Sequence, residues 1–176
     1  MRKLYLFAGT NGVGKSTLYL DGVGPSIENS VRINADEIAR EKGWDWRDPK
    51  TNAKALLLET KKLQKVLKTG QDINLETTLA GHEKTIVKLL GRIKKNNYQI
   101  VLLYVGVSSP DIAVERVKER VAKGGHGVPE ELIRKRYYES LNNLNRLISK
   151  FDIVKIYDNV NCNIKLDTSC SLIDVV

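Results

Sequence analysis

The sequence of 176 residues is poor in the residues that build zinc sites or disulfides. It has two cysteines, Cys162 and Cys170, and two histidines, His82 and His126. The cysteines lack the C-x-x-C spacing of zinc sites, and neither histidine lies near them in the sequence. We therefore expect two reduced thiols of an intracellular protein rather than metal ligands.

Long hydrophobic runs are also missing. The longest nearly uninterrupted apolar stretch is I-V-L-L-Y-V at residues 100–105, far short of the ~20 residues that span a membrane. The basic start Arg2-Lys3 leads within a few residues into the glycine-rich segment 9–16, without a cleavable apolar region of the kind that signal peptides have. We expect a cytoplasmic protein in which residues 1–176 form a single domain, because 41% hydrophobic residues are enough for one core.

The formal charge of +8 raises the question of a nucleic-acid partner. It is concentrated in the first 150 residues, which carry +10. Most lysines, however, are spread along expected helix faces, and the aromatic residues lie mostly on apolar stripes instead of alternating with basic ones. Because a site for a triphosphate and a phosphorylated substrate also needs positive charge, we expect small-molecule substrates rather than nucleic acid.

The strongest positive signal is a phosphate-binding loop. Residues 9–16 read G-T-N-G-V-G-K-S, which fits G-x-x-x-x-G-K-[ST] at every fixed position, and the apolar run 4–8 precedes them. In such a loop backbone N–H groups surround the phosphates, Lys15 reaches the β- and γ-phosphates, and Ser16 offers its hydroxyl to Mg²⁺. We therefore predict ATP and Mg²⁺ as cofactors, held by Gly9, Thr10, Asn11, Gly12, Val13, Gly14, Lys15, Ser16 and Thr17. The alternative, a chance turn before a capped helix, does not explain the order of strand, loop and helix.

Four further strand-like runs follow, at residues 31–34, 72–75, 99–105 and 152–157. Helical patterns lie between most of them, and this alternation predicts an α/β fold, a P-loop NTPase-type parallel sheet with helices on both faces. We assign the apolar helical stripes to the core: Leu56, Leu63 and Leu67; Ile86, Leu90 and Ile93; Val114, Val117 and Val121; Ile133, Tyr137, Leu141, Leu144 and Ile148.

Polar residues directly after the strands are the candidates for chemistry, since open α/β sheets bind ligands at the carboxyl ends of their strands. Asp36 follows the second run, and we predict that it orients the acceptor hydroxyl, although a role as a helix cap stays open. Glu76 ends the third run and would lie near the metal or the acceptor if that strand neighbours the first. Thr77 and Thr78 add hydroxyls to the same corner and are candidate substrate ligands.

A basic, glycine-rich segment is the second strong feature. Residues 122–129 contain three glycines and are predicted to form a lid, with the tryptophan-containing loop 44–49 as another cover. His126 within the lid is expected to order the loop rather than to contact phosphate. Any single arginine here could be an ordinary surface residue. Four of them flank the glycines, however, which favours a lid with a function: Arg116, Arg120, Arg134 and Arg136.

Five segments together resemble the zeta toxin family of P-loop kinases, especially its short stand-alone members. They are the phosphate loop, I-N-A-D-E-I-A at 33–39, E-T-T-L-A-G at 76–81, G-G-H-G-V-P-E-E-L-I-R-K-R-Y at 124–137, and Y-D-N at 157–159. The likeness covers roughly residues 3–160. The phosphate loop is shared with many NTPases, whereas the ordered set is much more specific.

The resemblance implies an ATP- and Mg²⁺-dependent kinase, which in the toxin members phosphorylates the 3′-hydroxyl of a UDP-N-acetyl sugar. It implies catalytic roles for Lys15, Asp36, Arg120 and Arg134, and metal contacts for Ser16 and Glu76. Asp158 and Asn159 would lie near the adenine, while Asp36, Glu76, Thr77, Thr78 and Arg136 are the candidate substrate ligands.

The acceptor and the partners stay open. The chain is shorter than the longer toxins, and the tryptophan loop and a helix near residues 50–69 replace the region that flanks their acceptor pocket. An antitoxin is compatible with the resemblance but is not readable here. A nucleoside or polynucleotide kinase is the closest alternative. A nucleotide-hydrolysing motor and a nucleic-acid-binding regulatory ATPase fit less well, because the third strand ends in one acid rather than two and because neither explains the arginine-rich lid.

Overall fold

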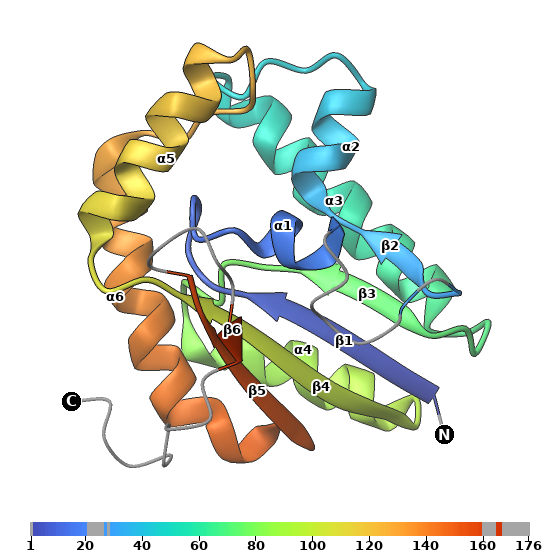
Figure 1. Cartoon of the computed structure of the whole chain (residues 1–176). Helices are drawn as coiled ribbons and strands as arrows, with labels where there is room; N and C mark the ends of the chain where they lie inside the picture. The colour runs from blue at the N-terminus through green and yellow to red at the C-terminus, as the bar shows by residue number, and fades with distance from the viewer. Residues whose placement is uncertain (1, 21–26, 28, 160–164, 167–176) are drawn as a thin grey trace.

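The fold was obtained as a computed structural model that describes residues 2–20, 27, 29–159 and 165–166. Within these residues, six strands form one sheet in the order β2-β3-β1-β4-β5-β6 (Figure 1). Their bounds are β1 Arg2–Ala8, β2 Val31–Ile33, β3 Ile73–Glu76, β4 Tyr98–Gly106, β5 Ile153–Asp158 and β6 Lys165–Leu166. The first five are parallel, and β6 is antiparallel to β5.

This sheet confirms the predicted α/β class and all five predicted strands, with ends that differ by one or two residues. The antiparallel β6 was not predicted, because two residues carry no periodicity. The predicted thiols Cys162 and Cys170 lie outside the described residues.

Six α-helices connect the described strands. They are α1 Lys15–Leu20, α2 Ala35–Glu41, α3 Pro49–Val66, α4 Glu83–Lys95, α5 Pro110–Ala122 and α6 Glu130–Leu147, the last continued by a 3₁₀ turn at Ile148–Lys150. Proline in the first turn fits the starts of α3 and α5, since the missing N–H would have no partner there. None of the described helices is long and apolar enough to cross a membrane.

The helices cover both faces of the sheet (Figure 1). Alternate residues of β1 point to opposite faces: Leu4 and Leu6 pack in one core with α3, α4 and α6, whereas Tyr5 and Phe7 pack in the other with α1 and α5. Burial on both faces explains why β1 and β4 read as continuous apolar runs rather than alternating ones.

The prediction that Leu56 belongs to the core was wrong. Leu56 is 56% exposed, and its neighbour Leu57 is 54% exposed, whereas Ala55 is buried. The first half of α3 packs beside α2 instead of over the sheet, so it turns a small residue inward at this end (Figure 1). Leu63 and Leu67, farther along, are buried as predicted.

Candidate active site

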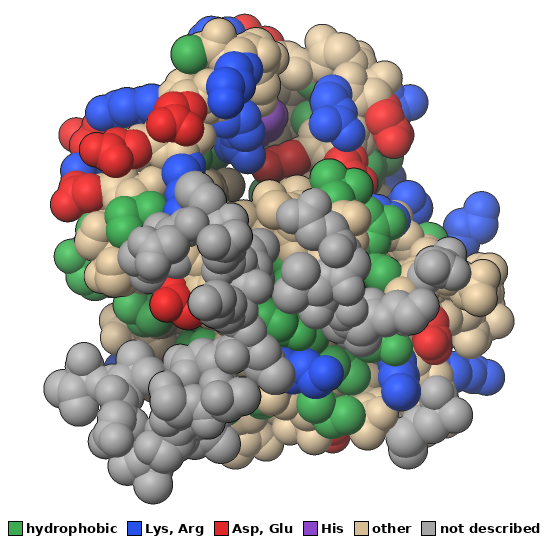
Figure 2. Space-filling view, viewed as in Figure 1, with side chains coloured by type: hydrophobic (Ala, Val, Ile, Leu, Met, Phe, Trp, Pro, Cys, Tyr) green, Lys and Arg blue, Asp and Glu red, His purple; other side chains and the backbone are tan. Residues whose placement is uncertain are grey.

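A cavity of about 930 Å³ opens at the carboxyl ends of the central strands. The phosphate loop and α1 form its floor, α2 and the loop after it form one wall, and α5 with the start of the lid forms the other. Figure 2 shows the hollow near the top of the view, with Lys and Arg side chains on both sides and acidic side chains between them. Ligand sites of open α/β sheets occur at this position.

The phosphate loop curls tightly between β1 and α1. Gly9, Gly12 and Gly14 all have positive φ, and a Cβ on Gly12 would overlap the backbone of Ala113 in α5. The loop therefore allows α5 to approach closely.

Lys15 is folded back onto this loop. It is 6% exposed, and its Nζ donates to the Thr10 carbonyl at 2.9 Å. Burial lowers the pKa of Lys15 from its usual value, while the nearby carboxylates of Glu76 and Asp36 act in the opposite direction. The ammonium thus lies at the floor of the cavity, with a backbone carbonyl as its hydrogen-bond partner.

Glu76 and Ser16 come together beside Lys15. Phe7 at the end of β1 pairs in register with Glu76 of β3, which confirms the neighbouring strands on which the prediction for Glu76 depended. The Ser16 hydroxyl donates to Glu76 Oε2 at 3.3 Å, and Glu76 Oε1 lies 3.8 Å from Lys15 Nζ.

These two side chains fit Mg²⁺. No group of three or more His, Cys, Asp or Glu side chains within the described part of the chain could hold a metal. Mg²⁺ does not require such a group, because it binds through one or two protein oxygens together with substrate phosphates and water. The hydroxyl of Ser16 and the carboxylate of Glu76 supply oxygen ligands of that kind.

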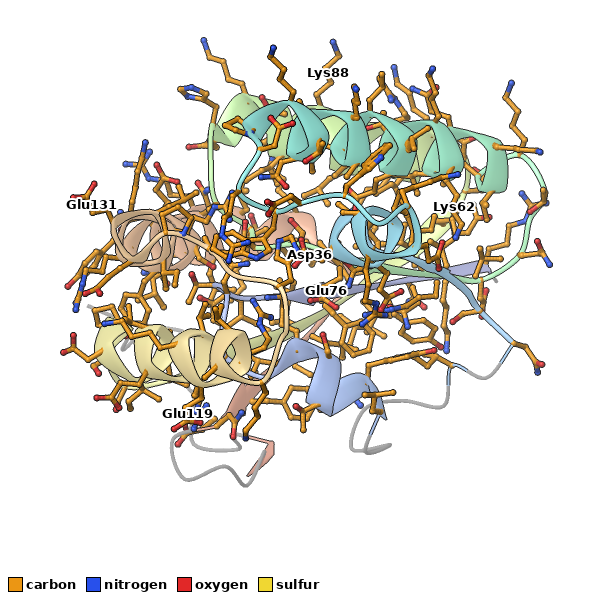
Figure 3. The ribbon with its side chains drawn as sticks, turned by 90° about the horizontal axis from the view of Figure 1, so that it is seen from above. Asp36, Lys62, Glu76, Lys88, Glu119 and Glu131 are labelled. Carbon is orange, nitrogen blue, oxygen red and sulfur yellow. The ribbon has the colours of Figure 1, made fainter. Side chains whose placement is uncertain are left out.

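Asp36 lies on the wall of the cavity rather than at a helix cap. Asn34 is the N-cap of α2, and its side-chain oxygen accepts from the backbone N–H groups of Asp36 and Glu37. The cap alternative for Asp36 is therefore wrong. Its side chain is 47% exposed, and Figure 3 shows Asp36 and Glu76 pointing into the centre of the molecule while Lys88, Glu119 and Glu131 point outward.

Arg116 and Arg120 of α5 line the cavity opposite Asp36. The Nε and Nη2 atoms of Arg120 are buried and have no hydrogen-bond partner among the described residues. Buried guanidinium nitrogens are costly to leave unpaired, so this side chain fits an anion that the cavity would take up.

Arg134 does not lie with them. It is paired with Asp111 at 2.7 Å and with Glu130 at 2.8 Å, and it is not among the residues that line the cavity. The sequence resemblance placed both arginines at the transition state, whereas the structure brings only Arg120 to the cavity wall.

The hydroxyls of Thr77 and Thr78 do not line the cavity either. They accept from the backbone N–H groups of Leu79 and Ala80 and hold the turn after β3. Both residues therefore have a visible structural role.

The chain after β5 reaches the phosphate loop. Asn159 is buried, lines the cavity, and donates to the Val13 carbonyl at 2.8 Å, while its Oδ1 has no partner among the described residues. Asp158 is exposed and is not a lining residue. Of the predicted adenine pair, only Asn159 faces the cavity.

Arg136 borders a narrower chamber of about 120 Å³ on the other side of Asp36. Its guanidinium donates to Asn11 Oδ1 at 3.0 Å, which links α6 to the phosphate loop. The chamber shares Asn11, Asp36, Trp46 and His126 with the main cavity, so these four residues separate the two spaces.

The two predicted covers touch each other above Asp36. A Cβ on Gly127 would overlap the indole of Trp46, and the rings of Trp46 and His126 lie 6.1 Å apart. His126 Nε2 is 3.6 Å from Asp36 Oδ1. Figure 1 shows the loop between α5 and α6 meeting the loop after α2 at the top of the view.

Sequence reasoning missed charged residues near the site, among them Arg32 and Glu59. Arg32 on β2 lines the cavity and binds Glu76. Glu59 on α3 accepts from the backbone N–H of Ala35 at 3.0 Å, and burial, the main cause, raises its pKa to about 7. The sequence feature that could have revealed this cluster is Arg32, because a charged side chain in the middle of a short parallel strand needs a partner of opposite charge.

The matching sequence profile is that of the zeta toxin family, over residues 2–169. The chain belongs to the zeta toxin family. A relative from Haemophilus influenzae (strain Rd), an uncharacterized protein, is 30% identical over 141 residues, which cover 77% of this chain and 92% of that one.

Solved structures share the fold. The structure of the PezAT chromosomal toxin–antitoxin system of Streptococcus pneumoniae matches with a TM-score of 0.68 at 16% identity, over 90% of this chain and 69% of that one. The complex of AvrRxo1-ORF1 and AvrRxo1-ORF2 with ATP matches with a TM-score of 0.68 at 11% identity, over 94% of this chain and 57% of that one. The chain thus has the P-loop kinase fold of its family.

Proposed function

We propose that this protein is an ATP- and Mg²⁺-dependent phosphotransferase that moves the γ-phosphoryl group of ATP onto a hydroxyl of a small acceptor. The observation that carries the proposal is the placement of Asp36. Its exposed carboxylate lines the same cavity as the buried ammonium of Lys15 and the unpaired guanidinium nitrogens of Arg120. A carboxylate base and phosphate-binding cations facing one cavity are the recurring parts of hydroxyl phosphorylation.

The phosphates would lie in the loop 9–16, with Lys15 at the β- and γ-phosphates. Mg²⁺ held by Ser16 and Glu76 would neutralise charge on the same phosphates. The oxygen of the acceptor hydroxyl forms a bond to the γ-phosphorus while Asp36 accepts the proton of that hydroxyl. The bond from the γ-phosphorus to the leaving ADP breaks. Arg120 stabilises the charge on the transferred group.

Three further assignments belong to the proposal. We propose a nucleotide sugar as the acceptor, following the family, and an antitoxin as a protein partner, in line with the toxin–antitoxin system to which the PezAT neighbour belongs. We also propose that residues 1–176 are one cytoplasmic domain. The roles of Arg134, Thr77, Thr78, Arg136 and Asp158 stay predictions that depend on rearrangement around bound ligands.

A transfer assay with labelled ATP and a panel of nucleotide sugars, nucleosides and oligonucleotides tests the function. Asp36→Asn keeps the shape of the side chain but removes its basicity, so it should retain ATP affinity and lower transfer by roughly a hundredfold to ten-thousandfold. Glu41→Gln, an exposed change on the same helix, serves as the control and should be as active as wild type.

Equal transfer by Asp36→Asn and wild type would remove Asp36 as the base. Transfer confined to nucleosides or oligonucleotide ends would replace the nucleotide-sugar acceptor while leaving the kinase assignment standing.

A further inference from the structure

Arg32 is more heavily bonded than its place in a three-residue strand would suggest. Its Nη2 donates to Glu76 Oε2 at 2.6 Å, and its Nε and Nη2 both donate to Glu37 Oε1, at 3.1 and 3.0 Å. Its Nη1 donates to Asn74 Oδ1 at 3.0 Å, and its guanidinium lies 4.3 Å from the centre of the Tyr19 ring. One planar group therefore connects β2 to α1, α2 and β3.

Each of those three elements also carries a residue of the proposed site. Ser16 is on α1, Asp36 is next to Glu37 on α2, and Glu76 ends β3. The Arg32 side chain is only 14% exposed and that of Glu76 only 11%, so their pair is shielded from solvent, whereas the Glu37 side chain is 31% exposed. A lysine could not make these bonds together, because they use the fixed fork of a guanidinium.

The oxygens of Glu76 are divided between two sides of the cavity floor. Oε2 accepts from Arg32, from Asn34 Nδ2 at 2.9 Å and from Ser16, whereas Oε1 faces Lys15 Nζ at 3.8 Å. Lys15 makes its short hydrogen bond to the Thr10 carbonyl and not to this carboxylate. The stronger contact of Glu76 is thus with Arg32, and Lys15 is left on the loop.

We infer that Arg32 is a positioning residue that holds Glu76 away from Lys15 and so keeps the ammonium available for the phosphates of ATP. This inference rests on the proposed function. Without Arg32 the carboxylate would lose its shortest contact in a poorly solvated place, and the cation nearest to its other oxygen is Lys15. A Lys15–Glu76 pair would then compete with the nucleotide.

ATP binding without metal tests the inference, since Mg²⁺ then plays no part. Calorimetric titration of ATP in EDTA should show Arg32→Gln binding about tenfold more weakly than wild type. Adding Glu76→Gln removes the competing carboxylate, so Arg32→Gln/Glu76→Gln should bind within about twofold of Glu76→Gln alone. Lys88→Gln, which removes an exposed positive charge that points away from the cavity (Figure 3), is the control and should change affinity by less than twofold.

Two results would overturn the inference. One is an Arg32→Gln protein that binds metal-free ATP as well as wild type does. The other is a loss that persists when Glu76→Gln is added, because Arg32 would then act directly on the nucleotide or through stability alone. Thermal unfolding of every variant reports whether it is folded.

If Arg32→Gln does not fold, Arg32→Lys provides the same comparison. It should bind about threefold more weakly than wild type and should again recover on addition of Glu76→Gln; a lack of recovery counts against the inference. Failure of the wild-type protein to bind ATP would instead remove the proposed function itself, together with this inference. The two failures are therefore distinguishable.

Discussion

Two arginines on opposite walls of the cavity have opposite surroundings. On the α2 side, the guanidinium of Arg32 bonds to Glu76, Glu37 and Asn74. On the α5 wall, two guanidinium nitrogens of Arg120 are buried and have no hydrogen-bond partner among the described residues. Both are partly buried cations at one site, and only their partners differ.

The difference separates shaping a site from binding its ligand. A guanidinium whose donors are used by protein carboxylates fixes the elements that carry them, and it has little left for a substrate. A guanidinium with buried unused donors gains most when an anion arrives, because its desolvation is already complete. We therefore assign Arg32 to the architecture of the site and Arg120 to the transferred phosphoryl group.

The largest effect that tests this comparison is expected at Arg120. Arg120→Lys keeps the charge but loses the planar fork, so it should lower turnover by tenfold or more with little change in ATP binding. Arg134→Lys is the matched control from α6, and its loss should be smaller, within about threefold, because Asp111 and Glu130 already engage that side chain. Steady-state kinetics of the two variants would decide it, and a larger loss at Arg134 would reverse the assignment.

A smaller effect is expected where the two walls meet. In Gly127→Ala the added methyl group would overlap the indole of Trp46, so the lid and the tryptophan loop should separate. Turnover should fall by about three- to fivefold, since the site would be less well closed to water. Tryptophan fluorescence should shift to the red.

Gly91→Ala in α4, where a methyl group would meet nothing within 4 Å, is the control for Gly127→Ala. It should leave both fluorescence and turnover unchanged. Unaltered fluorescence in Gly127→Ala would show that the two covers do not hold each other in solution.

The smallest effect is expected at Glu59, behind the α2 wall, and it concerns stability rather than activity. Its pKa is raised from the ordinary 4.5 to about 7, mainly by burial, with Asp36 and Glu76 adding to the shift. Between these pH values the folded protein holds a proton on Glu59 that the unfolded chain has lost. The contribution of this proton to the free energy of unfolding is therefore fully present below pH ~4.5 and is lost as the pH rises through ~7. Glu59→Gln keeps an acceptor for the Ala35 N–H but cannot ionise.

The unfolding free energy of Glu59→Gln should therefore depend less on pH between 5 and 7.5, by about 1 kcal/mol or more over that range. Urea unfolding at several pH values measures it. Parallel curves for the variant and wild type would show that Glu59 is ionised in the folded protein.

The sequence predicted the floor of this site better than its walls. The phosphate loop follows from local order along the chain, because a strand, a glycine turn and a helix are neighbours in sequence, whereas the place of Glu76 could be predicted only on the condition that β3 lies beside β1. The bonds of Arg32 depend on the register of β2 against β3, and the contact of Trp46 with Gly127 joins loops about 80 residues apart. Such tertiary contacts leave no periodic signal.

The same limit explains two corrections. Asp36 and Asn34 are both good cap residues, and only the backbone shows that Asn34 occupies the cap. The helical spacing of Leu56 matched that of Leu63, but spacing does not reveal that the start of α3 lies beside α2. Local pattern identified the chemistry, and packing decided which candidate faces the cavity.

Calorimetric titration of ATP·Mg²⁺ into wild type and Lys15→Ala tests the central assignment most directly. Lys15 is buried at the cavity floor with its ammonium hydrogen-bonded to the loop, so removing it takes away the cation expected to meet the β- and γ-phosphates. The account predicts that wild type binds ATP·Mg²⁺ and that Lys15→Ala binds on the order of a hundredfold more weakly while remaining folded. Equal affinity in the two proteins would contradict it.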